Sequence, residues 1–268
     1  MKVLDADFVR GFIHMADDGW LQGWHEANAG NISYRIKKWE VESIREELEP
    51  REWKPIGVKV PNLAWEFFLI TGAGKDFRNI KMHPEDCLCI IEIDGLGENY
   101  RVCWGLVNGG RPTSELETHL MNQDVKIGVT DGKCRVIYHA HPANIIALSY
   151  VLPLKDEVFT RELWECALVF PEAVGVLPWM VPGDSDIAIA TGEIMKKYNV
   201  AVWAHHGCFV AGENYDRVFG LMHAVEKSAE IRVKVRSMDN VTELKMTPEE
   251  LVRFSKYFNV EVPEKFLF

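Results

Sequence analysis

A strand–turn–strand signal, set within alternating helices and strands, most constrains the fold of this 268-residue chain. Residues 87–93 and 100–104 are apolar and β-prone, and the turn Asp94-Gly95-Leu96-Gly97 separates them. Strands joined by so short a connection pair antiparallel, whereas the surrounding alternation is typical of α/β proteins. We therefore predict one α/β domain over residues 1–268. It has three α/β/α layers, with a central mixed, largely antiparallel sheet flanked by helices.

Hydrophobic periodicity and capping signals predict the other elements, and no Pro/Ser-rich linker or internal repeat divides the chain. Ser114-Glu115-Leu116-Glu117 has the capping-box form, with Ser114 as N-cap and Glu115 in the opening turn. A second N-cap is expected at Ser185. The predicted helices are 7–20, 37–54, 114–125, 144–148, 160–165, 185–198 and 215–234; the further predicted strands are 32–35, 66–70, 135–139, 168–170 and 200–203.

Charge and cysteine usage restrict the partners and the compartment. A formal net charge of −10 and a pI near 5.4 argue against nucleic-acid binding. No apolar run approaches the ~18 residues of a membrane span, and the first residues lack a secretory signal. The six cysteines are scattered and form no Cys-x-x-Cys motif, as expected in a reducing compartment. We expect a cytoplasmic protein that binds neither nucleic acid nor membrane.

His139-Ala140-His141 follows the apolar strand signal Val136-Ile137-Tyr138. Alternate side chains of a strand share a face, so the two imidazoles are expected to point the same way. A catalytic zinc ion takes about three protein ligands and keeps one open position. A third imidazole is available at His205 or His206, and Glu115 could reach the same ion. The competing interpretation is ordinary strand-end histidines that form hydrogen bonds, because short patterns match by chance.

Two glycine-containing loops and one predicted helix start are candidate anion sites. Asn28-Ala29-Gly30-Asn31 and Thr71-Gly72-Ala73-Gly74 expose backbone N–H groups, and Thr113 and Ser114 precede a helix. Simple turns and helix capping explain the same residues, and neither loop matches a nucleotide-binding motif. Four other histidines have no such neighbours and are expected to be surface or core residues without a function: His14, His83, His119 and His223. Nothing around Lys75 indicates a Schiff-base lysine.

Taken together and in this order, these motifs resemble those of the class II aldolase/adducin family. The resemblance covers nearly the whole chain and implies a zinc site of His139, His141 and His206, with Glu115 as general acid and base. It implies that the substrate phosphate is bound by Asn28, Asn31, Gly72, Ala73, Gly74, Thr113 and Ser114. Ala73 departs from the family, where serine is common.

Within the family, the long insertion between Ser33 and Glu66 resembles the branch that cleaves L-rhamnulose 1-phosphate to dihydroxyacetone phosphate and L-lactaldehyde. The resemblance also implies a homotetramer with sites near subunit interfaces. Glu165 is a further catalytic candidate, although its segment is shorter than in relatives. The alternatives are another sugar-phosphate aldolase, epimerase or dehydratase of the family, or a non-catalytic adducin-like structural module.

Overall fold

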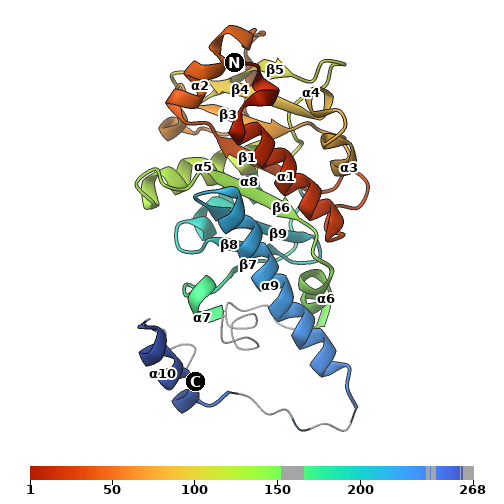
Figure 1. Cartoon of the computed structure of the whole chain (residues 1–268), viewed down its shortest axis with the longest axis vertical. Helices are drawn as coiled ribbons and strands as arrows, with labels where there is room; N and C mark the ends of the chain where they lie inside the picture. The colour runs from red at the N-terminus through yellow and green to blue at the C-terminus, as the bar shows by residue number, and fades with distance from the viewer. Residues whose placement is uncertain (152–165, 240–241, 243–245, 260, 262–268) are drawn as a thin grey trace.

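The computed structural model describes residues 1–151, 166–239, 242, 246–259 and 261, and in them a nine-stranded sheet forms the centre (Figure 1). Its order is β2-β5-β4-β3-β1-β6-β9-β8-β7. Every pairing is antiparallel except the parallel pair β7 and β8. The strands are β1 (Asn31–Arg35), β2 (Lys54–Pro55), β3 (Phe67–Thr71), β4 (Leu88–Ile93), β5 (Asn99–Gly105), β6 (Val136–Ala140), β7 (Gly175–Leu177), β8 (Val200–Trp203) and β9 (Gly207–Gly212). The predicted mixed, largely antiparallel sheet is confirmed.

The predicted hairpin forms between β4 and β5, with Ile93 paired to Tyr100. Asp94 stabilises its turn, because one carboxylate oxygen accepts from the backbone N–H groups of Leu96 and Glu98. The other oxygen accepts from the side chain of Asn99. An aspartate that hydrogen-bonds to the backbone just after it is a common way to close a tight turn.

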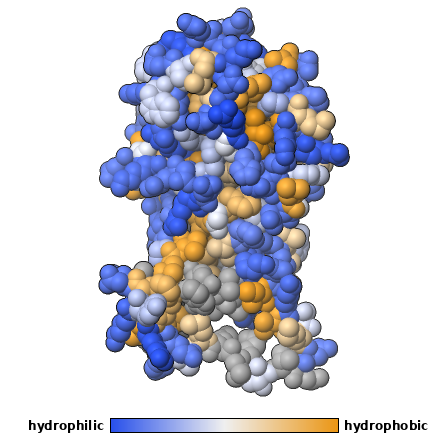
Figure 2. All heavy atoms as spheres, in the orientation of Figure 1, coloured by the Kyte–Doolittle hydropathy of each residue, from blue (hydrophilic) through white to orange (hydrophobic). Residues whose placement is uncertain are grey.

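Helices cover both faces of the sheet. In order, the helical segments are η1 (Val3–Asp5), α1 (Asp7–Leu21), α2 (Lys38–Ile44), η2 (Arg45–Glu47), η3 (Pro61–Leu63), α3 (Phe77–Ile80), α4 (Pro84–Cys87), α5 (Leu116–Val129), α6 (Ala143–Val151), α7 (Cys166–Val169), α8 (Ser185–Met195), α9 (Tyr215–Arg236) and α10 (Pro248–Phe258). Helices α1 and α9 lie in front of the sheet in Figure 1, and their outer surface is mostly hydrophilic in Figure 2. Within the described residues, no helix has the length and apolarity that a membrane span needs.

Side-chain alternation along β6 shows how the three layers are held together. Val136 and Tyr138 are buried in the core cluster that contains the apolar side chains of α1 and α9. Ile137 points to the opposite face, into the cluster that contains α8. Helix α5 packs on this second face beside α8. The predicted α/β/α layering is therefore confirmed, and His139 lies on the α5/α8 face.

Several predicted element boundaries and caps are wrong. The predicted strand 168–170 overlaps α7, and the strand that pairs with β8 is 175–177 instead, because a short apolar run does not by itself distinguish helix from strand. The N-cap of α8 is Asp184, whose side chain accepts from Asp186 N, and not Ser185. Residues 37–54 form only α2 and η2 before strand β2 begins. The predicted helix 160–165 lies outside the described residues.

The predicted capping box at the start of α5 does not form. The helix begins at Leu116, its N-cap is Glu115, and no side chain caps it. The hydroxyl of Thr113, not that of Ser114, accepts a hydrogen bond from Glu115 N. Thr113 is itself held by a backbone hydrogen bond from its N–H to Thr71 O, and the chain then turns at residues 114–115, where Leu116 N donates to Thr113 O. This shift of one residue leaves Glu115 at the junction between loop and helix.

Candidate metal centre and active site

Three histidines, two from β6 and its continuation and one from the β8–β9 turn, meet at one end of β6. His139 is in β6, His141 follows that strand, and His206 lies in the turn between β8 and β9. One ring nitrogen of each lies within 4.8 Å of those of the other two, and the Nε2 atoms of His139 and His141 are 3.2 Å apart. His205 instead places its ring 4.3 Å from that of Tyr150. Of the two candidates for the third imidazole, His206 is therefore the one that joins the cluster.

The outward nitrogens of two rings are already held by acceptors. His139 Nδ1 lies 3.1 Å from the carbonyl oxygen of Cys208, and His141 Nδ1 lies 2.6 Å from Glu26 Oε1. Each acceptor needs a proton on Nδ1, which leaves the lone pair of each Nε2 directed towards the other histidines. Metal-binding histidines are commonly oriented in this way by a carbonyl or a carboxylate.

Burial also keeps two of the rings uncharged. It is the largest cause that lowers the pKa of His139 well below its usual value and that of His206 to about 4, with the neighbouring His141 lowering both further. A metal ion binds neutral imidazole, so the rings need not lose a proton at neutral pH. The donor set, its spacing and its tautomers therefore fit a divalent transition metal.

Glu115 adds a buried carboxylate to the cluster. Its Oε2 lies 3.6 Å from His139 Nε2 and its Oε1 lies 3.9 Å from His206 Nε2. Burial raises the pKa of Glu115 to about 7, and the hydrogen bond from Asn31 opposes this rise. A carboxylate with such a pKa is a good proton acceptor and donor near neutral pH.

The predicted phosphate-binding segments lie side by side in the structure. Gly72 and Pro112 form an isolated antiparallel bridge, so the loop after β3 runs beside residues 111–113. Thr71 Oγ1 accepts from Ile32 N and so ties this loop to the strand that follows Asn28. Three distant parts of the sequence thus meet next to Glu115.

Several donors in these segments are, however, already used within the protein. Gly72 N donates to Cys87 O, and Ala73 N donates to Arg111 O. The Asn31 side chain donates to Glu115 Oε2. Asn28, Gly74 and Ser114 are exposed. Fewer hydrogen-bond donors are therefore left to bind a phosphate than the sequence indicates.

Two residues that contact the site, Glu26 and His119, are not predicted from the sequence. The predicted catalytic residue Glu165 lies outside the described residues. Glu26 contacts His141, and its place two residues before Asn28 was the only available signal. The sequence pattern indicates no function for His119, yet its Nε2 lies 2.5 Å from Asn31 Oδ1. The signal here was its position four residues after Glu115, which puts both on one side of a helix. Lys75 forms an ion pair with Asp86 at 2.8 Å.

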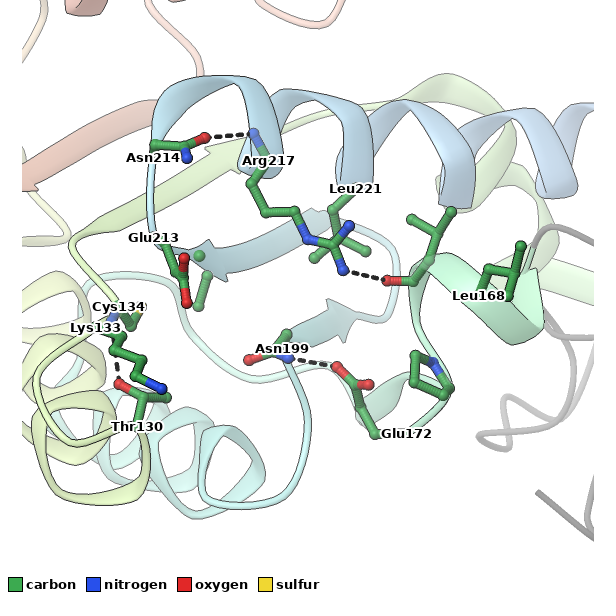
Figure 3. A pocket seen from close by; sticks show the side chains of 14 residues that line it. Thr130, Lys133, Cys134, Leu168, Glu172, Asn199, Glu213, Asn214, Arg217 and Leu221 are labelled. Carbon is green, nitrogen blue, oxygen red and sulfur yellow. Dashed lines mark hydrogen bonds between the residues drawn. The ribbon is translucent and has the colours of Figure 1, made fainter. Parts of the chain in front are cut away.

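A cavity of about 390 Å³ opens at the other end of β6 and β9 (Figure 3). Cys134, just before β6, and Gly212, the last residue of β9, help to line it. The histidines lie at the opposite ends of these two strands. This cavity is therefore separate from the candidate metal centre.

Comparison with known proteins agrees with this geometry. A protein of Pectobacterium atrosepticum named rhamnulose-1-phosphate aldolase is 45% identical over 263 residues, which cover 96% of each chain. One of the same name from Mannheimia succiniciproducens is 46% identical over 254 residues, covering 92% of this chain and 93% of that protein. The crystal structure of a sugar-phosphate aldolase from Thermotoga maritima superposes with a TM-score of 0.76 at 25% identity, covering 88% and 97%. Residues 11–233 match the family described as class II aldolase and adducin N-terminal domain, and the chain belongs to that family.

Proposed function

We propose that this protein is a zinc-dependent aldolase that cleaves L-rhamnulose 1-phosphate to dihydroxyacetone phosphate and L-lactaldehyde. The convergence of three imidazoles and one buried carboxylate carries this proposal. The substrate follows from the full-length likeness to relatives named rhamnulose-1-phosphate aldolase.

His139, His141 and His206 would hold the zinc ion, because an all-imidazole set of three suits a catalytic zinc site with an open position. When bound, zinc supplies Lewis-acid stabilisation of the negative charge that develops on the ketone half of the substrate. The aromatic ring of Phe209 stacks on His139 with 4.2 Å between ring centroids and keeps that imidazole in place.

Glu115 moves the proton at the reacting carbon. Cleavage breaks the C3–C4 bond of the ketose: the ionised Glu115 carboxylate takes the proton of the C4 hydroxyl, which becomes the aldehyde, while the bonding electrons stay on C3. Glu115 then gives a proton to C3, which completes dihydroxyacetone phosphate, and in the reverse direction it removes that proton. A cation beside Glu115 lowers its pKa and favours the ionised form that starts the reverse reaction.

The phosphate lies against the 28–31, 71–74 and 113–114 segments. Asn28, Ser114 and Thr113 offer side-chain donors, since the Thr113 hydroxyl that accepts from Glu115 N still has its own proton to give. Gly74 offers a backbone N–H. Gly72 and Ala73, whose N–H groups are used internally, have no side-chain atoms beyond Cβ and so leave room for the phosphate. Asn31 serves Glu115 rather than the phosphate.

A coupled assay for dihydroxyacetone phosphate tests the proposal. The purified protein should contain one zinc ion per chain, lose activity with a strong chelator and regain it when Zn²⁺ is added. A panel of ketose 1-phosphates should show the highest kcat/KM for L-rhamnulose 1-phosphate. Preference for another sugar phosphate would point to a different aldolase, epimerase or dehydratase of the family. Absence of both zinc and activity would favour an adducin-like structural module.

The assembly and the compartment are part of the same proposal. A cytoplasmic location is supported by the six cysteines, all of which lie among the described residues, are buried and form no disulfide there. A homotetramer with sites near subunit interfaces is expected from the family, and light scattering of the purified protein measures it directly. Glu165 stays a candidate for a second catalytic carboxylate, which Glu165→Gln would test by its turnover.

A further inference from the structure

A row of buried polar side chains runs from Glu115 into the interior of the protein. Asn31 Nδ2 lies 2.9 Å from Glu115 Oε2, and Asn31 Oδ1 lies 2.5 Å from His119 Nε2. His119 Nδ1 lies 2.8 Å from Ser33 Oγ, and Gln123 Nε2 lies 3.2 Å from the same oxygen. We call these five residues the buried polar chain. His119, Ser33 and Gln123 are fully buried, and Asn31 and Glu115 are each 6% exposed.

The direction of each hydrogen bond in the buried polar chain follows from its two ends. At the inner end, Gln123 Nε2 lies 3.0 Å from the carbonyl oxygen of Arg135, which only accepts, so this atom is the donor nitrogen. At the outer end, an ionised Glu115 only accepts, so Asn31 must present its NH₂ group to it. The carbonyl oxygen of Asn31 then faces His119.

His119 is left with only one suitable protonation state. Burial lowers its pKa to about 3, so the ring is neutral and carries a single proton. Because Asn31 Oδ1 only accepts, that proton is on Nε2. Nδ1 must then accept from the Ser33 hydroxyl, whose oxygen in turn accepts from Gln123. In every hydrogen bond of the buried polar chain, the donor is therefore the residue farther along the chain from Glu115.

We propose that His119, as the neutral Nε2–H tautomer, is a positioning residue for proton transfer by Glu115. By donating to the Asn31 carbonyl, it fixes which way the Asn31 amide points. Asn31 then holds Glu115 Oε2, which leaves Oε1 on the side of His206, 3.9 Å from its Nε2. His119 touches neither the substrate nor the metal ligand atoms in this role. The inference rests on the proposed function only in assigning the proton transfer to Glu115.

Two substitutions of His119 separate positioning from packing. The amide nitrogen of glutamine can occupy the place of Nε2, so His119→Gln retains a donor to Asn31. Asparagine reaches only the place of Nδ1, so His119→Asn retains a polar contact with Ser33 and loses the donor to Asn31. Thr118→Val is the matched control, because Thr118 is the adjacent residue of α5, fully buried, with a hydroxyl that bonds nothing in the described part of the chain.

For each variant, kcat and KM with L-rhamnulose 1-phosphate, zinc per chain and thermal unfolding are measured. Without the His119 donor the Asn31 amide is free to turn away from Glu115, so His119→Asn should lower kcat by about 10- to 100-fold, the size expected when a carboxylate loses a hydrogen bond. KM and zinc content should change little, since neither depends on the Asn31 amide. His119→Gln should recover most of the lost turnover, and Thr118→Val should retain parental kcat.

Other outcomes overturn the proposal. These are parental kcat in a folded His119→Asn, an equal loss of kcat in both His119 variants, or losses that follow unfolding temperature in all three proteins. If His119→Asn does not fold, turnover of Asn31→Asp is measured instead. The aspartate has the size of asparagine but no N–H group to donate to Glu115. Normal turnover of that variant also refutes the role.

The tautomer can be tested without any activity. Nitrogen-15 NMR of histidine-labelled parent enzyme should show His119 protonated at Nε2 and not at Nδ1, with His119→Gln used for assignment. The opposite tautomer would refute the inference. If the parent does not cleave the sugar phosphate but His119 shows the expected tautomer, the proposed function fails while the direction of the buried polar chain stands.

Discussion

Removing Glu26 should weaken metal binding without removing a metal ligand. Glu26 Oε1 lies 2.6 Å from His141 Nδ1 and requires the proton on that nitrogen. In Glu26→Ala this acceptor is lost, so the His141 ring is free to rotate and to move its proton to the metal-facing Nε2. Losing such an outer partner typically costs 10- to 100-fold in metal affinity. Because the Glu26 side chain is 66% exposed, water replaces part of the interaction, and we expect about 10-fold.

The assay is a titration of the metal-free protein with Zn²⁺ in competition with a chromophoric chelator of known affinity. A 10-fold weaker binding corresponds to ~1.4 kcal/mol. Glu213→Ala is the matched control: it removes one surface charge as well, but just after β9, at the end of that strand away from the histidines. A Kd for Glu26→Ala within ~2-fold of the parent value would refute the reasoning, because differences of that size are within the usual scatter. An equal change in the Kd of Glu213→Ala would also refute it.

Four further outcomes are expected. Glu115→Gln should lower kcat by ~10²–10⁴-fold with zinc retained; normal turnover with zinc bound would reduce Glu115 to a helix-start residue. Asn28→Ala should raise KM for the phosphorylated ketose at least ~10-fold, through loss of a charge-assisted hydrogen bond, but leave the slow rate on L-rhamnulose unchanged; equal losses on both would place the phosphate elsewhere. Gly30→Ala should lower the free energy of unfolding in urea by ~1–3 kcal/mol, because φ is +78° and a Cβ would lie 2.3 Å from His25 Nδ1; unchanged stability would contradict this. The pKa values of His25 and His119 are both lowered to about 3 by burial, so below pH 6.5 only the unfolded chain takes up these protons. Urea unfolding of the metal-free protein should therefore show a stability loss of ~2 kcal/mol per histidine between pH 7 and 5, which His119→Gln should reduce by its share.

The sequence predicted those features that follow from local geometry. The shared face of His139 and His141 follows from the two-residue period of a strand, which holds whatever the neighbours are. The β4–β5 hairpin follows from its turn residues and the short connection. Layering also follows, since interleaved helices and strands bury their apolar faces only by covering a sheet.

Features that depend on which elements become neighbours were not predictable from pattern. His119 and Asn31 are 88 residues apart, and their contact exists because α5 crosses the sheet over β1. Glu26 and His141 are 115 residues apart. Periodicity identifies the face on which a side chain lies but not the partner that it meets there. Residues 207–212, whose sequence predicts no element, form β9 for the same reason: the strand pairs with β6 and β8 on either side.

The loop from Trp24 to Asn31 shows why the metal, proton-transfer and phosphate sites form one unit. The carbonyl of Trp24 accepts from His141 N, and Glu26 holds the ring of the same histidine. At the other end, Asn31 holds Glu115, and Asn28 is exposed between the two. His25 is buried beneath this loop, with Nδ1 3.0 Å from Ala29 O and Nε2 2.7 Å from Tyr138 OH, so it fastens the loop to β6. A displacement of the loop would therefore disturb a metal ligand and the general base together. The glycine and asparagine pattern that first indicated an anion site is thus also the pattern of a segment that must fit closely between β6 and α5.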